Sequence, residues 1–421
     1  MKILVLGAGR MGHGAAFDLV HNSPGVETVT IADYDLKKAE ALAEAVGTSR
    51  IDAHHIDAAV HSDVARLMRG HDSAISCVNY WYNESLSLAA IETGTNFCDL
   101  GGNNYVVDAQ LALDDQAKAA GINIIPDCGL APGMVSILAM HGAAKFERLD
   151  ELHIRVGGLP QDPQPPLDYQ LVFSVEGLLN EYIETARVIR GGKITEVGSM
   201  TEIESLEFDG FPPLEAFQTS GGTSTLPDTF LGKIKELDYK TIRYAGHCEK
   251  FKTMIDLGLC SSEPLSEPPA HLLPDEEWPQ ARVAGAADGQ SAARSGTQII
   301  PRKVFGKLLE KHLPADGPDY VLVRLEFVGT RDTSSAAESA TRTPNSTIGG
   351  LPYNIKEKPP PPAGPPEMTG PPPSPASIIA QMMARGDVLE RGATPQEKAI
   401  DPEKFVAELA RRNINVNGSW L

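Results

Sequence analysis

Three glycines near the start of the chain have the spacing of a nucleotide-binding turn. The segment at residues 7–12 reads GAGRMG, follows an apolar run and precedes a helical pattern. Gly7 permits a tight turn, Gly9 lets the backbone approach a diphosphate, and Gly12 lets helix and strand pack closely. The diphosphate would lie against the free N–H groups and the positive dipole end of the helix, so no basic residue is required. The residues expected to contact a dinucleotide here are Gly7, Gly9, Arg10, Met11 and Gly12.

A carboxylate follows at the distance that a ribose-binding acid requires. Asp33 ends the second expected strand, about 20 residues after the glycines, where it can accept hydrogen bonds from both ribose hydroxyls. Tyr34 and Asp35 come next, and neither can balance a 2′-phosphate as an arginine would. NAD is therefore expected as the cofactor in preference to NADP. The alternatives are FAD, for which no further flavin-contacting sequence is found, and a glycine-rich turn that binds no cofactor.

Side chains at the ends of later strands are further candidates. Asp57 ends the third expected strand, where a side chain can face the adenine, and it could equally be a surface aspartate. Val78 and Asn79 end the fourth strand, at the edge of the sheet where the nicotinamide half of the cofactor is expected. Asn79 could bind the ribose or the carboxamide, or cap a loop. Asp127 ends the sixth strand at the same edge, so it either faces the nicotinamide and the substrate amine or caps backbone groups.

The elements that position these residues alternate between short β-rich runs and helical patterns from residue 1 to residue 129. This alternation is typical of a parallel sheet covered by helices on both faces. Ala39, Leu42, Ala43 and Val46 share one face of a helix, as a sheet-facing stripe requires. We therefore predict an α/β fold, with a doubly wound Rossmann-type NAD-binding domain over residues 1–129. Its expected strands are Ile3–Leu6, Thr28–Ala32, Ile51–Ile56, Ser73–Val78, Asn96–Asp99 and Ile122–Ile125.

Longer β-rich pieces follow, and a second, α+β domain is predicted over residues 130–330. It is expected to hold the substrate in a cleft against the first domain and to mediate dimerisation. Two helical patterns, Ser377–Arg385 and Asp401–Arg412, are expected to complete the first domain within residues 376–421. The expected strands of the second domain are Leu152–Val156, Tyr169–Phe173, Ala186–Ile189, Lys193–Val197 and Tyr320–Val328.

Two stretches break the globular pattern. Residues 263–297 are rich in Pro, Ala, Gly and Ser and are expected to form an exposed insert. Residues 331–375 include ten prolines between Pro359 and Pro375, which leave too few amide hydrogens for a helix or a sheet. This segment is expected to be a polyproline-like linker or a disordered insert. The alternative is a docking motif for a proline-binding module.

Composition argues against several classes of partner. The 421 residues include 56 acidic and 37 basic ones, for a formal charge of −19. Such a surface repels phosphate backbones and anionic lipids, so neither nucleic acid nor a membrane is expected as a partner. No secretory leader and no apolar run of about 18 residues is found, and a cytoplasmic protein is expected. The five cysteines form no C-x-x-C pair and the histidines form no helical metal signature, so no metal site is expected.

Several motifs resemble the saccharopine dehydrogenase superfamily. They are PDCGLAPG at residues 126–133, GGLP at 157–160 and TIRY at 241–244, besides the glycines of the first turn. Within the superfamily the chain most resembles the lysine 6-dehydrogenase group, over residues 1–262, 298–330 and 377–414. Ala131 stands where saccharopine reductases usually carry an aspartate, and it matches the lysine 6-dehydrogenase pattern. The proline-rich segment departs from the family, which has a compact segment there.

The resemblance implies NAD-dependent oxidation of a primary amine, the side-chain nitrogen of L-lysine. Hydride leaves the carbon that bears the neutral amine, and water converts the resulting imine into the 6-semialdehyde and ammonia. The protein must then hold the amine deprotonated and set its C–H bond about 3–3.5 Å from the nicotinamide. The alternative enzyme is a saccharopine-type or carboxynorspermidine-type reductase, which condenses an amine with a carbonyl and reduces the imine. The alternative outside catalysis is a redox sensor that binds NAD(H).

Arg243 and His247 are the principal substrate-site candidates. The planar guanidinium of Arg243 can pair with both oxygens of an amino-acid carboxylate, and the resemblance implies that it faces the substrate. Arg243 could also be a structural ion-pair partner. His247, four residues on, is expected to move a proton near neutral pH, with a structural histidine as the alternative. Asp127 is the second catalytic candidate.

Tyr169, Glu181 and Tyr182 are expected to line an amine pocket. A carboxylate and phenol rings stabilise an ammonium group as it arrives. Each of the three could instead serve packing or lie at the surface. A small amino acid is therefore the expected partner. A homo-oligomer is also expected, because β-rich second domains of this kind often pair across a two-fold axis.

Overall fold

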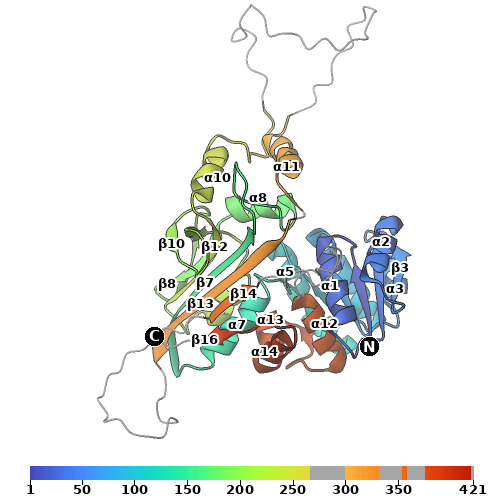
Figure 1. Ribbon diagram of the computed structural model, residues 1–421. Helices are drawn as coiled ribbons and strands as arrows, with labels where there is room; N and C mark the ends of the chain where they lie inside the picture. Colours follow the sequence, from blue (N-terminus) through green and yellow to red (C-terminus); the bar gives the residue numbers. More distant parts are fainter. Residues whose placement is uncertain (266–298, 316, 331–352, 358–374, 419–421) are drawn as a thin grey trace, which may run out of the picture.

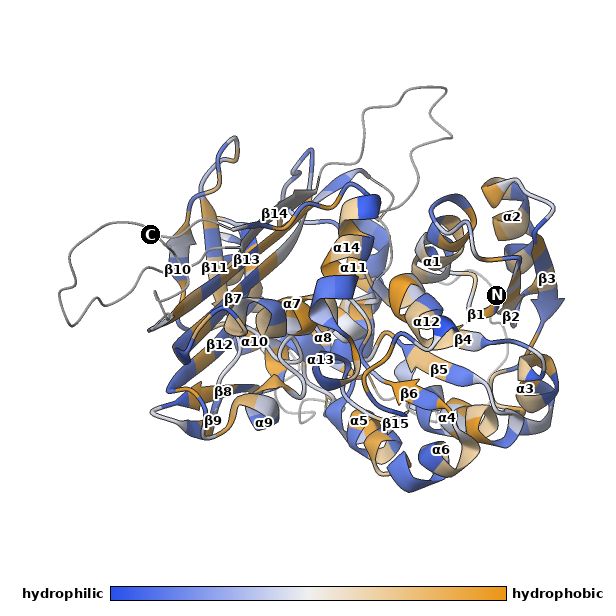
Figure 2. Cartoon of the chain, turned by 90° about the horizontal axis from the view of Figure 1, so that it is seen from below, coloured by the Kyte–Doolittle hydropathy of each residue, from blue (hydrophilic) through white to orange (hydrophobic). Residues whose placement is uncertain are grey.

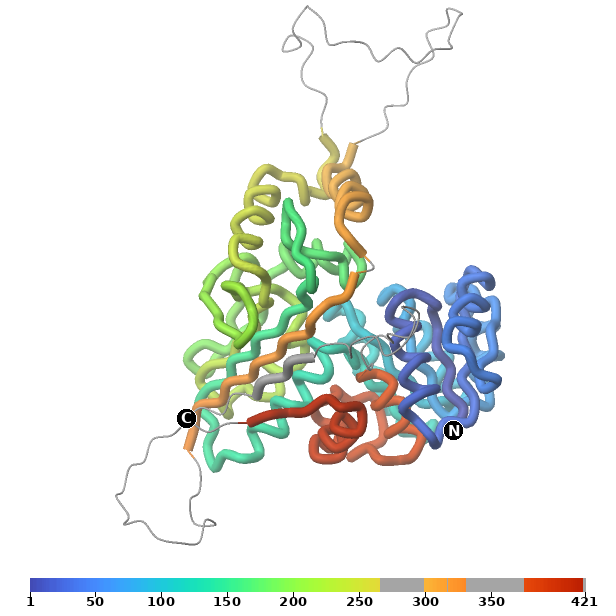
Figure 3. Tube along the Cα trace, viewed as in Figure 1, coloured from blue at the N-terminus to red at the C-terminus, as the bar shows by residue number. Residues whose placement is uncertain are grey.

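The computed structural model describes residues 1–265, 299–315, 317–330, 353–357 and 375–418 (Figure 1). The N-terminal part of the chain forms a parallel sheet, and the middle of the chain forms a larger, mostly antiparallel sheet. Residues 375–418 return from the second sheet to the first and lie beside both (Figure 3). The fold class predicted from the sequence, a Rossmann-type sheet with a second α+β domain, is confirmed.

Seven strands form the N-terminal sheet. They are β1 (Lys2–Leu6), β2 (Thr28–Asp33), β3 (Ile51–His55), β4 (Ser73–Ser76), β5 (Asn96–Asp99), β6 (Asn123–Ile125) and β15 (Gly392–Ala393). Their order is β15-β6-β5-β4-β1-β2-β3, and every pairing is parallel. The six expected strands are all present, and the C-terminal segment adds β15. The order reverses beside β1, so a ligand crevice is expected at the carboxyl ends of β1 and β4.

Helices cover both faces of this sheet. They are α1 (Arg10–His21), α2 (Leu36–Val46), α3 (His61–Met68), η1 (Tyr80–Tyr82), α4 (Asn83–Thr93), α5 (Asn104–Leu111) and α6 (Asp114–Ala120). On one face, α1 and α2 bury Leu19 and Leu42 in the core that contains Ile3. On the other face, α3 and α4 bury Met68 and Leu86 in a separate core. The predicted apolar stripe of α2 is largely buried, as expected for a helix that faces a sheet.

The second sheet has nine strands. They are β7 (Arg148–Pro160), β8 (Ala186–Arg190), β9 (Lys193–Val197), β10 (Glu204–Leu206), β11 (Leu214–Gln218), β12 (Glu236–Tyr244), β13 (Asp319–Thr330), β14 (Tyr353–Glu357) and β16 (Asn417–Gly418). The path runs β10-β11-β12-β7-β13-β14-β16, and β8 pairs with β12 and β9. Only β7 and β12 run parallel among these described pairs.

One expected strand of the second domain is wrong. The segment Tyr169–Phe173 forms no strand in the structure. Tyr169, Gln170 and Leu171 are all buried, so the segment does not alternate between a core face and a solvent face. The Leu171 N–H donates to the carbonyl oxygen of Pro314 at 2.8 Å, and the Gln170 side chain donates to the carbonyl oxygen of Gly317 at 2.9 Å. A neighbouring loop therefore satisfies the polar groups that a partner strand would satisfy.

The remaining described helices belong to the second domain and to the C-terminal segment. They are α7 (Met134–Ala143), α8 (Val175–Ile183), α9 (Leu226–Phe230), α10 (His247–Asp256), α11 (Pro301–His312), α12 (Pro375–Arg385), α13 (Gln396–Ala399) and α14 (Pro402–Arg411). Figure 2 shows α7 and α12 as largely apolar helices between the two sheets. The side chain of Phe327 on β13 packs so closely on α7 that a Cβ on Gly142 would lie 2.1 Å from it. The two sheets share one continuous core through α7, α12 and their neighbours α9, α13 and α14, whereas α8, α10 and α11 pack in a separate core of the second domain.

The C-terminal segment packs against both domains. Helix α12 contacts α1, β4 and β5, and the hydroxyl of Ser73 donates to the carbonyl oxygen of Ala380 at 2.9 Å. Arg412 forms a fully buried ion pair with Asp18 on α1, with an N–O distance of 2.8 Å. Helices α13 and α14 instead pack on α7, and β16 pairs with β14. The segment expected to complete the first domain therefore also ties that domain to the second.

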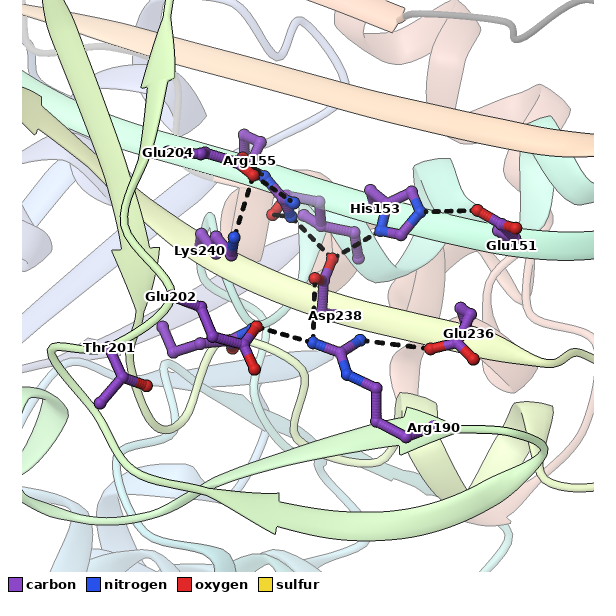
Figure 4. A network of polar contacts seen from close by, with 12 residues as sticks. Glu151, His153, Arg155, Arg190, Thr201, Glu202, Glu204, Glu236, Asp238 and Lys240 are labelled. Carbon is purple, nitrogen blue, oxygen red and sulfur yellow. Dashed lines mark hydrogen bonds and ion pairs between the residues drawn. The ribbon is translucent and has the colours of Figure 1, made fainter.

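A network of charged side chains covers the face of the second sheet that points away from α7 (Figure 4). Asp238 on β12 accepts hydrogen bonds from Arg155 and His153 on β7, both at 2.8 Å. Lys240 pairs with Glu204 at 2.9 Å, and Glu204 also pairs with Arg155. Burial disfavours the charge of Asp238, but hydrogen bonds from His153 and Arg155 outweigh it and hold its pKa well below the usual range. A cavity of about 430 Å³ opens beside this network.

Part of the expected linker is ordered. Residues 353–357 form β14, which pairs antiparallel with β13 inside the segment 331–375. The expected insert 263–297, apart from its first three residues, lies outside the described residues. So does the rest of the expected linker, apart from Pro375, which begins α12. In the described part of the chain no helix could span a membrane, and no cluster of side chains could hold a metal ion.

Candidate cofactor and substrate site

The glycine turn between β1 and α1 has the space that a dinucleotide needs. Gly7 has a φ of +103°, and a Cβ there would lie 2.8 Å from the carbonyl oxygen of Cys77. A Cβ on Gly12 would lie 1.9 Å from the carbonyl oxygen of Gly7, so both positions require glycine for packing. A Cβ on Gly9, in contrast, would meet no described atom within 4 Å. The space in front of Gly9 is open, as a diphosphate-binding turn requires.

The first turn of α1 offers hydrogen-bond donors beside this space. Gly9 is the N-cap, and no side chain of the described residues caps this end of the helix. The leading N–H groups and the helix dipole therefore favour an anion. Met11 is 41% exposed on this turn. The Nη1 group of Arg10 reaches the second domain, where it donates to the carbonyl oxygen of Leu171 at 2.5 Å.

The carboxylate of Asp33 lies against the same turn. It accepts the N–H of Ala8 at 2.7 Å and the N–H of Asp35 at 2.8 Å, one on each oxygen. Each oxygen keeps a lone pair that can accept a hydroxyl hydrogen. Tyr34 is 72% exposed and presents no positive charge at this edge. The turn, the helix end and Asp33 together fit the diphosphate and ribose of an adenine dinucleotide.

The other cofactor candidates lie along the same edge of the sheet. Asp57 follows β3, and its carboxylate accepts the N–H of Ala59 at 2.9 Å, which makes it a turn-capping residue. The side chain of Val78 lies 3.2 Å from the place of a Cβ on Gly7. Asn79 precedes η1, and its carbonyl oxygen accepts the N–H of Tyr82 at 3.2 Å. Contacts of Asp57, Val78 and Asn79 with a cofactor stay predictions.

Asp127 is a buried acid at the carboxyl edge of the sheet. It is 2% exposed, it has a φ of +61°, and its carboxylate accepts the hydroxyl hydrogen of Ser224 from the second domain. Its backbone N–H points to the carboxylate of Asp99 at 3.3 Å. Burial and then the negative charge of Asp99 raise the pKa of Asp127 to about 7, against a lowering by the Ser224 hydroxyl. Asp127 can therefore exchange a proton near neutral pH.

Arg243 is the centre of the second cluster. It is 3% exposed on β12, and its Nε group donates to the hydroxyl of Tyr182 at 2.9 Å. Its guanidinium carbon lies 4.8 Å from the ring centre of Tyr169 and 5.8 Å from that of Tyr182. Nη1 donates to the carbonyl oxygen of Ile242 at 2.9 Å. Among the described residues no carboxylate lies within ion-pair distance of Arg243, although Glu181 is near enough to favour its charge.

His247 continues this cluster. Its Nδ1 lies 2.9 Å from the carbonyl oxygen of Leu167 and its Nε2 lies 3.1 Å from the hydroxyl of Tyr182. Nδ1 must donate to the carbonyl, so Nε2 of a neutral ring accepts the Tyr182 hydrogen. Burial, and then the charge of Arg243, lower the pKa of His247 to about 3. The structure differs here from the expectation of a histidine that titrates near neutral pH.

Glu181 and the two tyrosines complete the cluster. The carboxylate of Glu181 accepts hydroxyl hydrogens from Thr241 at 2.6 Å and from Thr219 at 3.2 Å. Burial raises the pKa of Tyr169 to about 12 and that of Tyr182 further above its usual range, so both phenols stay neutral. The predicted substrate residues Arg243, Tyr169 and Tyr182 lie together with the predicted catalytic residue His247, and Glu181 lies beside them.

The structure joins the two predicted sites at two points. Arg10 of the cofactor turn contacts Leu171, two residues from Tyr169, and Ser224 contacts Asp127. Sequence analysis did not assign Ser224, Asp99 or the contact of Arg10 with the second domain. Ser224 stands in the STLP motif at residues 224–227, but only the folded chain shows that it meets Asp127.

Comparisons with known proteins match the two domains of this chain to one family. The family models for the saccharopine dehydrogenase NADP binding domain and C-terminal domain match residues 3–125 and 129–414. The saccharopine dehydrogenase [NADP(+), L-glutamate-forming] of Saccharomyces cerevisiae is 26% identical over 278 residues, which cover 62% of this chain and 59% of that protein. The carboxynorspermidine synthase of Vibrio cholerae is 25% identical over 63% of this chain and 68% of that protein. The match thus spans about three-fifths of the yeast relative.

Two solved structures have the same fold. The apo saccharopine dehydrogenase (L-Glu forming) of Saccharomyces cerevisiae has a TM-score of 0.70 and 18% identity, and covers 100% of this chain and 99% of that chain. The homospermidine synthase of Legionella pneumophila, in complex with NAD, has a TM-score of 0.61 and 12% identity, and covers 100% and 91%. The superfamily predicted from the motifs is therefore confirmed, whereas the lysine 6-dehydrogenase group stays a prediction. The chain belongs to the saccharopine dehydrogenase family.

Proposed function

We propose that this protein is an NAD-dependent dehydrogenase that oxidises the side-chain amine of L-lysine, releasing the 6-semialdehyde and ammonia. The observation that carries the proposal is Arg243, a buried guanidinium without a carboxylate partner among the described residues. A buried charge is costly unless it is paired, so this cation favours an anionic ligand. The α-carboxylate of an amino acid, held by the planar guanidinium, supplies that anion.

Arg243 alone is sufficient for a substrate with one carboxylate. Of the other cations in the described residues, Lys250 and Arg302 are paired with Asp168 and Glu176, whereas Arg10 of the cofactor turn reaches the carbonyl oxygen of Leu171 near Tyr169. Saccharopine carries several carboxylates and would need more than one free cation in the pocket. Lysine carries one carboxylate. Its side-chain ammonium group would be stabilised by the phenol rings of Tyr169 and Tyr182 and by the carboxylate of Glu181.

We assign proton transfer to Asp127 and positioning to His247. When bound, NAD supplies the hydride acceptor. The carboxylate of Asp127, with a pKa of about 7, can take the proton that the substrate ammonium must lose before hydride transfer. His247, which stays neutral, fixes the hydroxyl of Tyr182, and Tyr182 in turn fixes the Nε edge of Arg243. The guanidinium is thereby held in one orientation before the substrate arrives.

NAD is proposed in preference to NADP, although the family model and the yeast relative name NADP. The carboxylate of Asp33 lies at the ribose edge, that of Asp35 follows as the N-cap of α2, where it accepts the N–H of Lys37 at 3.1 Å, and Tyr34 brings no positive charge. A 2′-phosphate there would face like charges at short distance. The contacts of Gly7, Gly9, Arg10, Met11 and Gly12 with the diphosphate half belong to the same proposal. A cytoplasmic location and a homo-oligomer also stay proposals.

The decisive experiment is a substrate panel with purified full-length protein. Lysine with NAD⁺ at alkaline pH is expected to form NADH and release ammonia, with NADP⁺, ornithine and other diamines tested beside it. The second candidate, favoured by the names of the two relatives, is a reductase of the saccharopine or carboxynorspermidine type. Consumption of NADH or NADPH only when an amine and a carbonyl substrate are supplied together would establish that candidate. Binding of NAD(H) without turnover of any pair would favour the redox sensor.

A further inference from the structure

Helix α9 and the residue before its N-cap are held by carboxyl groups from outside the second domain. The hydroxyl of Ser224 donates to Asp127, which follows β6 of the first sheet. Within α9 and its N-cap, the hydroxyls of Thr225 and Thr229 donate to Glu397 on α13, at 2.9 and 2.7 Å. Asp127 and Glu397 are each 2% exposed. Hydroxyl groups of one short segment therefore bind two buried acids from separate parts of the chain.

Backbone conformation and close packing constrain the contact between Ser224 and Asp127. Both residues adopt a left-handed backbone, with φ values of +43° and +61°, a conformation that residues other than glycine rarely keep without a local reason. A Cβ on Gly101 would lie 1.8 Å from Oδ1 of Asp127, so this glycine leaves just enough room for the carboxylate. Ser224 itself is 5% exposed. The backbone of both domains thus places this hydroxyl on this carboxylate.

We propose that Ser224 is a positioning residue, through which the second domain holds the Asp127 carboxyl group in one orientation and favours its ionised form. The proposal rests on the acid–base role proposed for Asp127, and it adds a residue that controls that role from the opposite domain. Arrangement of the domains and protonation of Asp127 are then coupled, because displacement of α9 removes the hydroxyl.

The surroundings of Asp127 oppose ionisation of its carboxyl group, and the Ser224 hydroxyl acts against them. Burial is the main cause that raises the pKa of Asp127, and Asp99 on β5 and Glu397 on α13 raise it further, whereas the Ser224 hydroxyl lowers it. The neighbouring thiol of Cys128 stays neutral because burial raises its pKa well above the usual range. Ser224 is the hydrogen-bond donor that favours the ionised carboxylate among these described neighbours.

The test is a titration of Asp127 that does not depend on turnover. Full-length protein with carboxyl-labelled aspartate is followed by carbon NMR from acid to alkaline pH, and Asp127→Asn identifies the resonance. Ser224→Ala and Ser224→Gly both remove the hydroxyl, and the glycine variant also relieves the left-handed backbone, so at least one of them is expected to fold. In both, the midpoint of Asp127 is expected to rise by about one pH unit or more, as the loss of a hydrogen bond to a charged group predicts.

Ser220→Ala is the matched control, because its hydroxyl donates to the backbone carbonyl oxygen of Asn180 at 3.2 Å instead of to a carboxylate. An unchanged midpoint in both Ser224 variants, or an equal rise in Ser220→Ala, would overturn the proposal. The pH profile of kcat is measured on the same variants. A midpoint that rises in NMR while the kinetic profile stays fixed would support the contact of Ser224 and reject the catalytic role of Asp127.

Discussion

Gly9 offers a sharp test of the cofactor site, because the free protein leaves space in front of it. The change Gly9→Ala adds a methyl group that meets no described atom within 4 Å, at a residue whose φ of −78° suits alanine. The same change at Gly12 would place the methyl 1.9 Å from the carbonyl oxygen of Gly7. The two variants therefore separate loss of the ligand site from loss of packing.

The two variants are expected to differ in their effects on the free energy of unfolding and on the Kd for NAD. For Gly9→Ala, loss of a glycine N-cap costs about 0.5–1 kcal/mol, and the lower entropy of the unfolded chain offsets about 0.4–1 kcal/mol, so the free energy of unfolding should barely change. The methyl group would block one or two N–H contacts to the diphosphate, which predicts a Kd for NAD about 10–100 times higher. For Gly12→Ala, helix and strand must separate, which costs about 1–3 kcal/mol.

Calorimetric titration with NAD and NADH, together with thermal unfolding of the same samples, measures both effects. Gly198→Ala is the control, because the added Cβ would meet only the Thr201 methyl at 3.6 Å and lies outside the glycine turn. It should change neither quantity. Wild-type affinity in Gly9→Ala, at unchanged stability, would mean that no dinucleotide lies against this turn, and the proposed function would lose its basis.

Three further changes test the remaining groups. Asp33→Ala removes the proposed acceptor of the ribose hydroxyls, so the KM for NAD should rise about 10–100-fold with little change in the KM for lysine; an equal rise in both would place Asp33 elsewhere. Arg243→Lys keeps the charge but loses the bond to Tyr182, so the KM for lysine should rise about tenfold or more, and wild-type efficiency would remove Arg243 from substrate recognition. His153→Gln tests the network of charged side chains around Asp238 through the pH dependence of the free energy of unfolding. Burial opposes the charge of His153, but Asp238 outweighs it and raises the pKa, so the charged histidine stabilises the fold below its unfolded pKa of about 6.5 and loses this effect as the pH rises through the higher folded value. The difference in Tm between wild type and His153→Gln should therefore shrink from acid to alkaline pH, and a constant difference would contradict this reasoning.

The sequence predicts the first domain well because its signals are local. Apolar runs and the stripe of α2 each depend on a few neighbouring residues. The strand expected at Tyr169–Phe173 fails because its first three residues are all buried, and this burial depends on distant segments. A local pattern cannot distinguish such a segment from an apolar strand. The two-residue β15 gives too short a pattern to recognise.

The candidate site divides in the same way. The glycine turn and Asp33 could be predicted because motif, strand and helix adjoin in the sequence. The chemical state of His247 could not, since it follows from burial and from Arg243, neither of which its spacing in the sequence reveals. The contact of Ser224 with Asp127 joins residues 97 positions apart, and one sequence holds no signal for such a pair.

The return of the chain to its first sheet has a consequence for biosynthesis and for engineering. Strand β15 pairs with the edge of β6, and Asp18 on the first helix forms its buried ion pair with Arg412 near the other end of the described chain. A nascent chain that has emerged from the ribosome through residue 129 would carry an open sheet edge and a carboxylate destined for burial without its counterion. A chimaera that exchanges the Rossmann half with a relative must transplant residues 375–418 together with it.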